Sequence, residues 1–188
     1  LGLIPINSGQ IVVDGIDIST ASVQSLNLIR KNIGLLFQSS ALFDSLTVLD
    51  NVKFPLSESK SNLTPAEISQ RVFHALDLVE MTGFEDKYPS ELSGGQKKRI
   101  GLARALVRQP KVLLYDEPTT GLDPQLSTNI ENLINKMSLE LNVTTIVVTH
   151  QISTILRTSE KIFYLHHGQL LPAETPDSIF SSKNDTIR

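Results

Sequence analysis

The chain has 188 residues, which is enough for one domain with a sizeable hydrophobic core. Its 17 basic and 20 acidic side chains give a formal net charge of −3, which argues against a nucleic-acid-binding protein that relies on bulk positive charge. The absence of cysteine excludes disulfides and thiolate metal sites and suits a reducing cytosol. No apolar run approaches the ~18 residues of a membrane-spanning helix, so any membrane role must come through a partner.

The chain begins with the pattern of a hairpin, a weak helix and a strand. Residues 10–13 and 16–18 flank Asp14-Gly15, a dipeptide typical of hairpin turns. Residues 22–31 are weakly helical, and the apolar run 33–37 predicts a buried strand that ends at Gln38. The amide oxygen of Gln38 can ligate Mg²⁺ or orient a water molecule; the alternative is a residue that only ends the strand.

Residues 39–91 predict a helical insertion. A polar linker, residues 57–62, precedes a capping box from Thr64 to Glu67, with Pro65 at the first helical position. The helix that follows carries an apolar face formed by Ile68, Val72, Ala75, Leu76 and Val79. Most apolar residues before it will form a small local core. The best candidates for an exposed docking groove are Phe43, Leu46 and Phe54.

The run Leu92-Ser93-Gly94-Gly95-Gln96 opens a helix that we expect over residues 96–108. Ser93 can cap this helix, and Gly94 and Gly95 allow the backbone to approach a ligand closely. A helix N-terminus that is reached through glycines favours anion binding. Two glycines alone would indicate an ordinary helix start, but the full five-residue string is too specific for that interpretation.

Asp116 and Glu117 follow a short apolar run, Val112 to Tyr115, which predicts a buried strand in a parallel sheet. Ligands of open α/β sheets bind at the carboxyl ends of the strands. One acid at that place can hold Mg²⁺ and the other can act as a general base. Solvated acids in a turn are the alternative, and the nearby glycine-rich run favours the site.

Asp123 and Pro124 open a further helix, as N-cap and first helical residue. Capping alone would explain this aspartate. The apolar residues of the helix recur with helical spacing up to Leu141, and Asn142 can end it. A second β-rich run, residues 143–148, then brings His150 to a strand end, so the sequence predicts Asp116, Glu117 and His150 at one edge of a sheet.

The C-terminal part predicts four short elements. These are a helix over Ile152–Arg157, a last strand over Lys161–Leu165, a turn at Gly168-Gln169 and a terminal helix over Pro176–Phe180. The last eight residues are expected to fray.

Together these segments resemble the nucleotide-binding domain of ABC transporters. Residues 92–96 match the LSGGQ signature, residues 112–117 match Walker B with its catalytic glutamate, and residues 121–123 match the D-loop. Gln38 matches the Q-loop glutamine and His150 the switch histidine. The resemblance implies an α/β fold: a RecA-like P-loop NTPase core with a mostly parallel sheet, an N-terminal antiparallel β piece and an inserted α-helical subdomain.

The resemblance also implies a division of the chain. Residues 1–38 and 93–170 would form the two parts of the RecA-like core, the second beginning with the signature helix. Residues 39–92 would form the helical subdomain, and residues 171–188 a tail.

The family's cofactors are ATP and Mg²⁺, and its sites form between two domains arranged head to tail. The resemblance then implies catalytic roles for Glu117, His150 and Gln38, and Mg²⁺ binding by Asp116 and Gln38. The γ-phosphate would contact Ser93, Gly94, Gly95 and Gln96 of the opposite copy, and Asp123 would link the two sites.

One family motif is absent. The sequence contains no Walker A pattern GxxxxGK[ST], whose lysine and hydroxyl hold the β- and γ-phosphates and Mg²⁺. We expect a truncated chain or gene model; a degenerate domain that has lost catalysis is the alternative. In either case the polypeptide as written is expected to bind ATP poorly and to be inactive alone.

The segment Leu36 to Val52 resembles the ATPases of bacterial phospholipid transporters of the lipid-asymmetry, MCE-linked type. The resemblance implies phospholipid transport through a membrane permease that docks on residues 39–60, with an MCE-type lipid-binding protein as a further partner. It also implies a homodimer, peripheral on the cytoplasmic face of the bacterial inner membrane, and no nucleic-acid partner. Amino-acid importer ATPases match the motifs nearly as well and are the main alternative; a non-transport ABC ATPase or a non-hydrolysing partner domain is a third.

Overall fold

The computed structural model describes residues 1–58 and 63–179, and its centre is a parallel three-stranded sheet. The strands are β3 (Ile33–Leu36), β4 (Val112–Asp116) and β5 (Thr144–Val148), in the order β3-β4-β5. The register places Leu36 beside Tyr115 and Asp116 beside Val148. The predicted α/β fold with a parallel sheet is therefore confirmed, and the three carboxyl ends meet at one edge.

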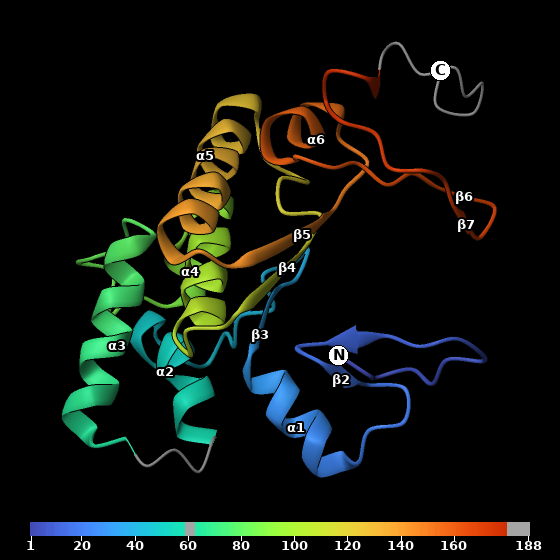
Figure 1. The fold of residues 1–188 in the computed structure, drawn as a ribbon. Helices are drawn as coiled ribbons and strands as arrows, with labels where there is room; N and C mark the ends of the chain where they lie inside the picture. Colours follow the sequence, from blue (N-terminus) through green and yellow to red (C-terminus); the bar gives the residue numbers. More distant parts are fainter. Residues whose placement is uncertain (59–62, 180–188) are drawn as a thin grey trace.

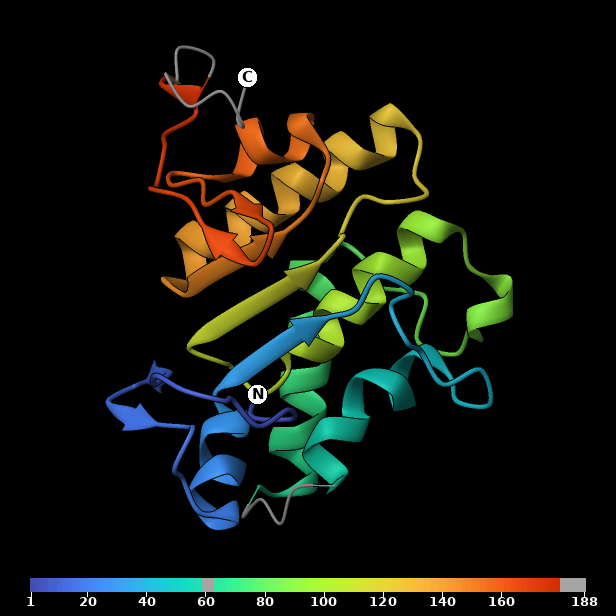
Figure 2. The same ribbon diagram turned by 90° about the vertical axis from the view of Figure 1, so that its right-hand side faces the viewer.

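One face of this sheet is covered by helices (Figures 1 and 2). The helix α4 (Gly94–Leu106) packs against β3, with α5 (Pro124–Leu141) beside it and α2 (Val48–Glu58) and α3 (Pro65–Leu78) beyond. Leu36, Leu113 and Tyr115 are buried below these helices. The approach of α4 is close, since a Cβ atom at Gly34 would lie 2.7 Å from the carbonyl oxygen of Ala105.

The opposite face of the sheet carries exposed apolar side chains. The exposed fraction is 52% for Ile146 and 61% for Val148, and Phe37, which follows the end of β3, is 45% exposed. The sequence predicts buried strands over the runs 33–37 and 112–115; their residues in β3 and β4 are buried or half-buried as predicted, whereas Phe37 and the outer face of β5 are exposed. The apolar runs have the composition of fully covered strands, but Figure 2 shows helices behind the sheet and none of the described ones in front of it.

The elements before α4 largely follow the predictions. Antiparallel strands β1 (Val12–Val13) and β2 (Ile16–Asp17) form the hairpin around Asp14-Gly15, although both are shorter than expected. The helices are α1 (Val23–Lys31), α2 (Val48–Glu58) and α3 (Pro65–Leu78). The capping box before α3 is present, with the backbone N–H of Thr64 donating to Glu67 Oε2 at 2.7 Å. Part of the predicted polar linker, residues 59–62, lies outside the described residues.

The helix α4 begins at Gly94 rather than at the predicted Gln96. The hydroxyl of Ser93 accepts a hydrogen bond from the backbone N–H of Gln96, so the cap lies immediately before the glycines. The helix ends at Leu106, because Gln109 has a φ of 55° and Pro110 follows. Asn142, with a φ of 48°, ends α5 as predicted.

The C-terminal predictions are only partly confirmed. The helix α6 (Ile152–Thr158) is present, but the last strand predicted over Lys161–Leu165 is not. Instead β6 (Leu165–His166) and β7 (Gln169–Leu170) form a small hairpin closed by His167 and Gly168, both of positive φ. The run is mostly exposed, with Phe163 at 57% and Leu165 at 68%, so it lacks a core face that would fix a longer strand.

In the region of the predicted terminal helix, residues 176–178 form a turn and Ile179 is in a 3₁₀ conformation. The backbone N–H groups of Ser178 and Ile179 both donate to the carbonyl of Thr175. The rest of that predicted helix, Phe180, and the tail 181–188 lie outside the described residues. Among residues 1–58 and 63–179, no helix combines the length and apolarity needed to cross a bilayer.

Candidate nucleotide site

The predicted acid and histidine meet at the carboxyl edge of the sheet. Glu117 follows β4 and His150 follows β5, and His150 Nδ1 lies 2.7 Å from Glu117 Oε1. A carboxylate only accepts hydrogen bonds, so Nδ1 carries the hydrogen and Nε2 is the ring nitrogen left for another partner. The His150 side chain is 75% exposed, which leaves it accessible to a ligand.

Four hydrogen bonds hold the carboxylate of Glu117. Oε1 accepts from the backbone N–H and the ring of His150, and Oε2 accepts from the hydroxyls of Thr120 at 2.9 Å and Thr149 at 3.1 Å. Burial acts most strongly on this group and would raise its pKa, but the hydrogen bonds together outweigh burial and lower the pKa below 4.5. Glu117 also has a φ of 47°, a backbone conformation that non-glycine residues rarely adopt and that is frequent at functional sites.

A buried lysine, not predicted from the sequence, joins this edge to Gln38. Lys98 on α4 is 5% exposed, and its Nζ donates to the carbonyl oxygens of Gln38 at 2.5 Å and Glu117 at 3.2 Å. Burial lowers the pKa of this ammonium, while the charges of Glu117 and Asp116 act in the opposite direction. Gln38 is therefore linked to Glu117 through Lys98. A lysine in a basic, amphipathic helix gave no sequence signal for this role.

Asp116 and Gln38 fit the chemistry of Mg²⁺ bound together with phosphate. Both side chains are exposed, both carry oxygen donors, and they come from neighbouring strands at the same edge. Among the described residues, no three histidine or acidic side chains gather into a metal cage. Two exposed oxygen donors suit Mg²⁺, which takes one or two protein oxygens and completes its shell with phosphate and water.

The glycine-rich helix start has the geometry of an anion site. Ser93 and Gly94 are exposed at the N-terminus of α4, where backbone N–H groups are unpaired. Gln96 completes a capping box, in which its Oε1 accepts from the N–H of Ser93 at 2.8 Å. Its amide oxygen is thus used within the helix start. Gly95 is buried against the next helix, because a Cβ there would lie 3.5 Å from Leu126.

Asp123 caps α5, as the sequence predicted. Its Oδ1 accepts from the backbone N–H of Leu126 at 2.9 Å, and the residue remains exposed. The structure thus accounts for this aspartate by capping and leaves its accessible surface free for a second contact.

Two of the three residues predicted to form a docking groove lie together. The rings of Phe43 and Phe54 are 4.7 Å apart between centroids, and their exposed fractions are 42% and 36%. The guanidinium of Arg104 lies 5.8 Å from the Phe43 ring. Leu46 is only half-buried nearby, and its carbonyl accepts from the side chain of Asn51.

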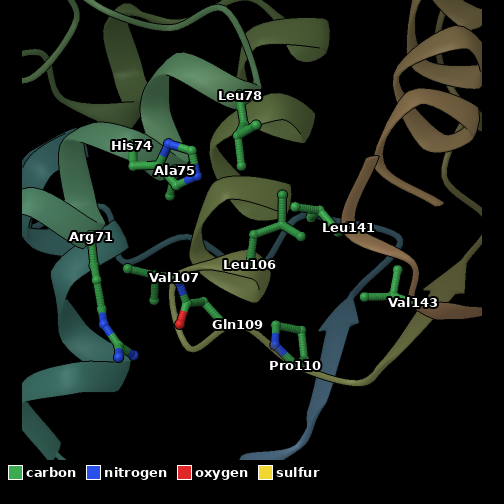
Figure 3. A pocket seen from close by; sticks show the side chains of 10 residues that line it. All are labelled: Arg71, His74, Ala75, Leu78, Leu106, Val107, Gln109, Pro110, Leu141 and Val143. Carbon is green, nitrogen blue, oxygen red and sulfur yellow. The ribbon is translucent and has the colours of Figure 1, made fainter. Parts of the chain in front are cut away.

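A separate pocket lies away from the predicted site (Figure 3). It has a volume of about 200 Å³ and opens between α3, the end of α4 and the end of α5. None of the predicted site residues lines it. Pro110 precedes β4 and Val143 precedes β5, so the pocket lies at the amino end of the sheet, opposite Asp116. Its lining residues are Arg71, His74, Ala75, Leu78, Leu106, Val107, Gln109, Pro110, Leu141 and Val143.

The chain is similar in sequence and in fold to known proteins of one family. The family model described as ABC transporter matches residues 1–120. The chain belongs to the ABC transporter family. Among curated members of this family, it is 40% identical over 176 residues to methionine import ATP-binding protein MetN 1 of Shouchella clausii, covering 93% of this chain and 50% of that protein. It is 37% identical over 187 residues to MetN of Wolinella succinogenes, covering 100% of this chain and 61% of that protein. The chain thus spans about half the length of the first of these relatives.

Solved ABC cassettes share the fold. The structure of cbiO1 from Clostridium perfringens, part of the transporter complex cbiONQ, superimposes with a TM-score of 0.87 at 35% identity, covering 97% of this chain and 72% of that one. The dimeric cassette MJ0796 in a post-hydrolysis state with ADP and Pi gives a TM-score of 0.81 at 32% identity, covering 93% and 76%. These similarities support the RecA-like ABC cassette fold predicted from the motifs. None of the relatives reported above is a phospholipid transporter, so that part of the sequence prediction receives no support.

Proposed function

We propose that this chain is the ATP-binding subunit of an ABC transporter that couples ATP hydrolysis to amino-acid import through a separate membrane permease. The observation that carries the ATPase part is the convergence of Glu117, His150, Asp116 and Gln38 at one edge of a parallel sheet. Phosphoryl transfer depends on positioned charges and an activated water more than on covalent chemistry, and this edge provides such groups.

In this proposal Glu117 acts as the general base. Its carboxylate is held between two strand ends, where it can accept a proton from a water molecule that attacks the γ-phosphate. Bound Mg²⁺, held by Asp116 and Gln38, would neutralise phosphate charge. His150 would contact the γ-phosphate through Nε2, because Nδ1 is bonded to Glu117.

A second copy of the chain would complete the site. The exposed helix start at Ser93 and Gly94 offers the Ser93 hydroxyl and the backbone N–H of Gly94 to the γ-phosphate held by the other copy. Asp123 would connect the two sites. The dimeric structure of MJ0796 supports a pair of such chains, and cbiO1, as part of an ABC transporter complex, supports assembly with further subunits.

The permease would dock on the Phe43–Phe54 pair within residues 39–60. An exposed aromatic pair beside a cation offers the apolar anchor and polar rim of a protein interface. The protein would then act at the cytoplasmic face of a bacterial membrane.

Amino-acid import is favoured over phospholipid transport by the relatives. Proteins named for methionine import match nearly the whole chain at 37% to 40% identity. The segment Leu36 to Val52 carried the phospholipid resemblance, and an MCE-type partner has no support in these comparisons. Substrate choice rests with the permease, so methionine or a similar amino acid is the proposal for the assembled transporter.

The ATPase part is tested by Glu117→Gln in the full-length protein. We expect phosphate release to fall at least about 100-fold, because the amide cannot accept the proton of water. ATP binding, measured by titration, should persist. Turnover equal to that of the unchanged protein would remove Glu117 from the assigned role.

The substrate part is tested by uptake in cells that express the full-length protein with its permease. We expect accumulation of labelled methionine that is lost with the Glu117→Gln variant. Phospholipid transfer between membranes without methionine uptake would refute the amino-acid proposal and restore the phospholipid interpretation.

A further inference from the structure

Glu131 is a buried carboxylate that the proposed mechanism does not use. It lies on α5 and is 1% exposed. Its Oε1 accepts from the hydroxyl of Thr154 on α6 at 2.8 Å, and its Oε2 lies 3.4 Å from Arg157 Nε. Burying a carboxylate costs stability unless its partners are well placed. Such a group therefore calls for a reason beyond packing two helices.

The hydrogen bonds of Glu131 continue toward the nucleotide site. Thr154 Oγ1 lies 2.8 Å from Thr119 Oγ1, and both residues are fully buried. Thr119 belongs to the loop between β4 and α5, and its hydroxyl also lies 3.0 Å from Gln151 Oε1. A threonine hydroxyl has one hydrogen to donate, so Thr119 donates to Thr154 or to Gln151, never to both.

Gln151 then reaches both threonines that hold Glu117. Its backbone N–H donates to Thr149 Oγ1 at 3.1 Å, and its side-chain Nε2 lies 3.5 Å from Thr120 Oγ1. These two hydroxyls are the ones that donate to Glu117 Oε2. Polar contacts thus run from Glu131 through Thr154, Thr119 and Gln151 to the proposed general base. Thr154 donates its hydrogen to Glu131, so Thr119 bonds either Thr154 or Gln151 Oε1 at any one time and the chain is interrupted at the other contact.

We propose that Glu131, Thr154 and Thr119 are positioning residues for Glu117. The chain joins the loop after β4, the loop after β5 and the helices α5 and α6, so it fixes the two strand ends relative to each other. A general base must be held within a fraction of an ångström of the productive geometry, and supporting hydrogen bonds supply that constraint. The inference rests on the proposed ATPase function and deepens it.

The test is the Thr154→Val variant of the full-length protein, with steady-state ATP hydrolysis measured by phosphate release. Valine has nearly the shape of threonine but cannot hydrogen-bond Glu131 or Thr119. We expect kcat to fall about tenfold with KM for ATP changed less than about twofold, since positioning affects the transition state more than binding. Thr154→Ser, which keeps the hydroxyl, should restore kcat to within about twofold.

The matched control is Thr158→Val on the same helix. Its hydroxyl donates only within α6, to the carbonyl of Thr154 at 2.7 Å, and so lies outside the chain to Glu117. This variant should keep kcat. Equal losses in Thr154→Val and Thr158→Val, with no rescue by serine, would overturn the inference and indicate helix packing alone.

A second variant, Gln151→Met, guards against misfolding of Thr154→Val, because Gln151 is only half-buried at the start of α6. It breaks the same chain at its other end, and kcat should again fall with KM little changed. If both variants keep kcat while Glu117→Gln abolishes hydrolysis, the positioning network is refuted and the proposed function stands. If the unchanged full-length protein and Glu117→Gln release phosphate equally, the proposed function itself fails.

Discussion

The edge of the sheet around Glu117 and the segment from Gln38 to Pro55 are held in opposite ways. Around Glu117, polar side chains donate to a side-chain carboxylate. In the segment, basic side chains of α4 and of Arg108, just beyond its end, donate to backbone carbonyls. Lys98 donates to the carbonyl of Gln38, and Arg104 donates to the carbonyls of Ser40 and Ala41 at 2.7 and 2.8 Å. Arg108 donates to the carbonyl of Pro55 at 2.9 Å.

The difference explains what each region can do. Ser40 and Ala41 have φ values of 62° and 46°, a strained conformation for residues with side chains, and the guanidinium of Arg104 stabilises the carbonyls there. The segment is thus fixed to the helix that presents Ser93. The segment that carries Phe43 is hydrogen-bonded to α4 and, through Lys98, linked to Glu117.

The largest effect on stability is expected from Asn51→Leu, within the segment. Asn51 is fully buried and accepts from the N–H of Phe43 at 2.8 Å, while its Nδ2 donates to the carbonyls of Phe43, Leu46 and Thr47. Leucine removes the partner of the Phe43 N–H and of the Leu46 carbonyl, while the carbonyls of Phe43 and Thr47 keep their backbone donors, so we expect a loss of about 3 kcal/mol in the free energy of unfolding. Urea unfolding of the full-length protein measures it.

The control for this prediction is Asn135→Leu on α5. Asn135 is half-buried and donates one hydrogen bond, to the carbonyl of Arg157 at 2.9 Å. Its loss should cost about 1 kcal/mol or less. Equal costs in the two variants would mean that the loop before α2 does not depend on Asn51.

A smaller effect, on activity as much as on stability, is expected from Lys98→Met. Methionine fills the same space but leaves the carbonyls of Gln38 and Glu117 without their shared donor. We expect ATP hydrolysis to fall about tenfold and the free energy of unfolding to fall by about 1 to 2 kcal/mol. Lys97→Met, one position earlier and not buried, is the control and should change both quantities little. Equal changes in ATP hydrolysis and in the free energy of unfolding for the two variants would show that Lys98 does not link Gln38 to Glu117.

The sequence placed the acidic and histidine side chains of the candidate site at one edge and gave no sign of the basic side chains that donate to backbone carbonyls. Asp116, Glu117 and His150 could be placed at one edge because apolar runs mark strands and parallel strands share an end. The caps at Ser93, Thr64 and Asp123 are local patterns and were also predictable. Every residue has a backbone carbonyl, so the residue types at 38–41 do not show which carbonyls accept from Lys98 or Arg104. The partners are also about 60 positions apart in the sequence.

The same limit applies to burial and to the last strand. The runs in β3, β4 and β5 are apolar enough for a sheet that is buried on both faces. Whether helices pack on the second face depends on other parts of the chain, so it cannot be predicted from the strand residues alone. Lys161 to Leu165 has strand-forming residues, yet strand formation needs a partner in register. The structure gives Leu165 and His166 a partner at the hairpin and gives Ile162 only an isolated bridge to Glu174.

The smallest effect concerns the dependence of stability on pH. Folding lowers the pKa of Glu117 below 4.5, through bonds from His150, Thr120 and Thr149 that outweigh burial. A carboxyl with a depressed pKa stabilises the fold fully above its unfolded pKa, and the contribution is lost as the pH falls through the folded value. Thermal midpoints of the full-length protein between pH 6 and 3 should therefore fall less steeply for Glu117→Gln, by about 2 to 4 °C over that range. Parallel curves for the two proteins would show that these hydrogen bonds do not favour the ionised form of Glu117.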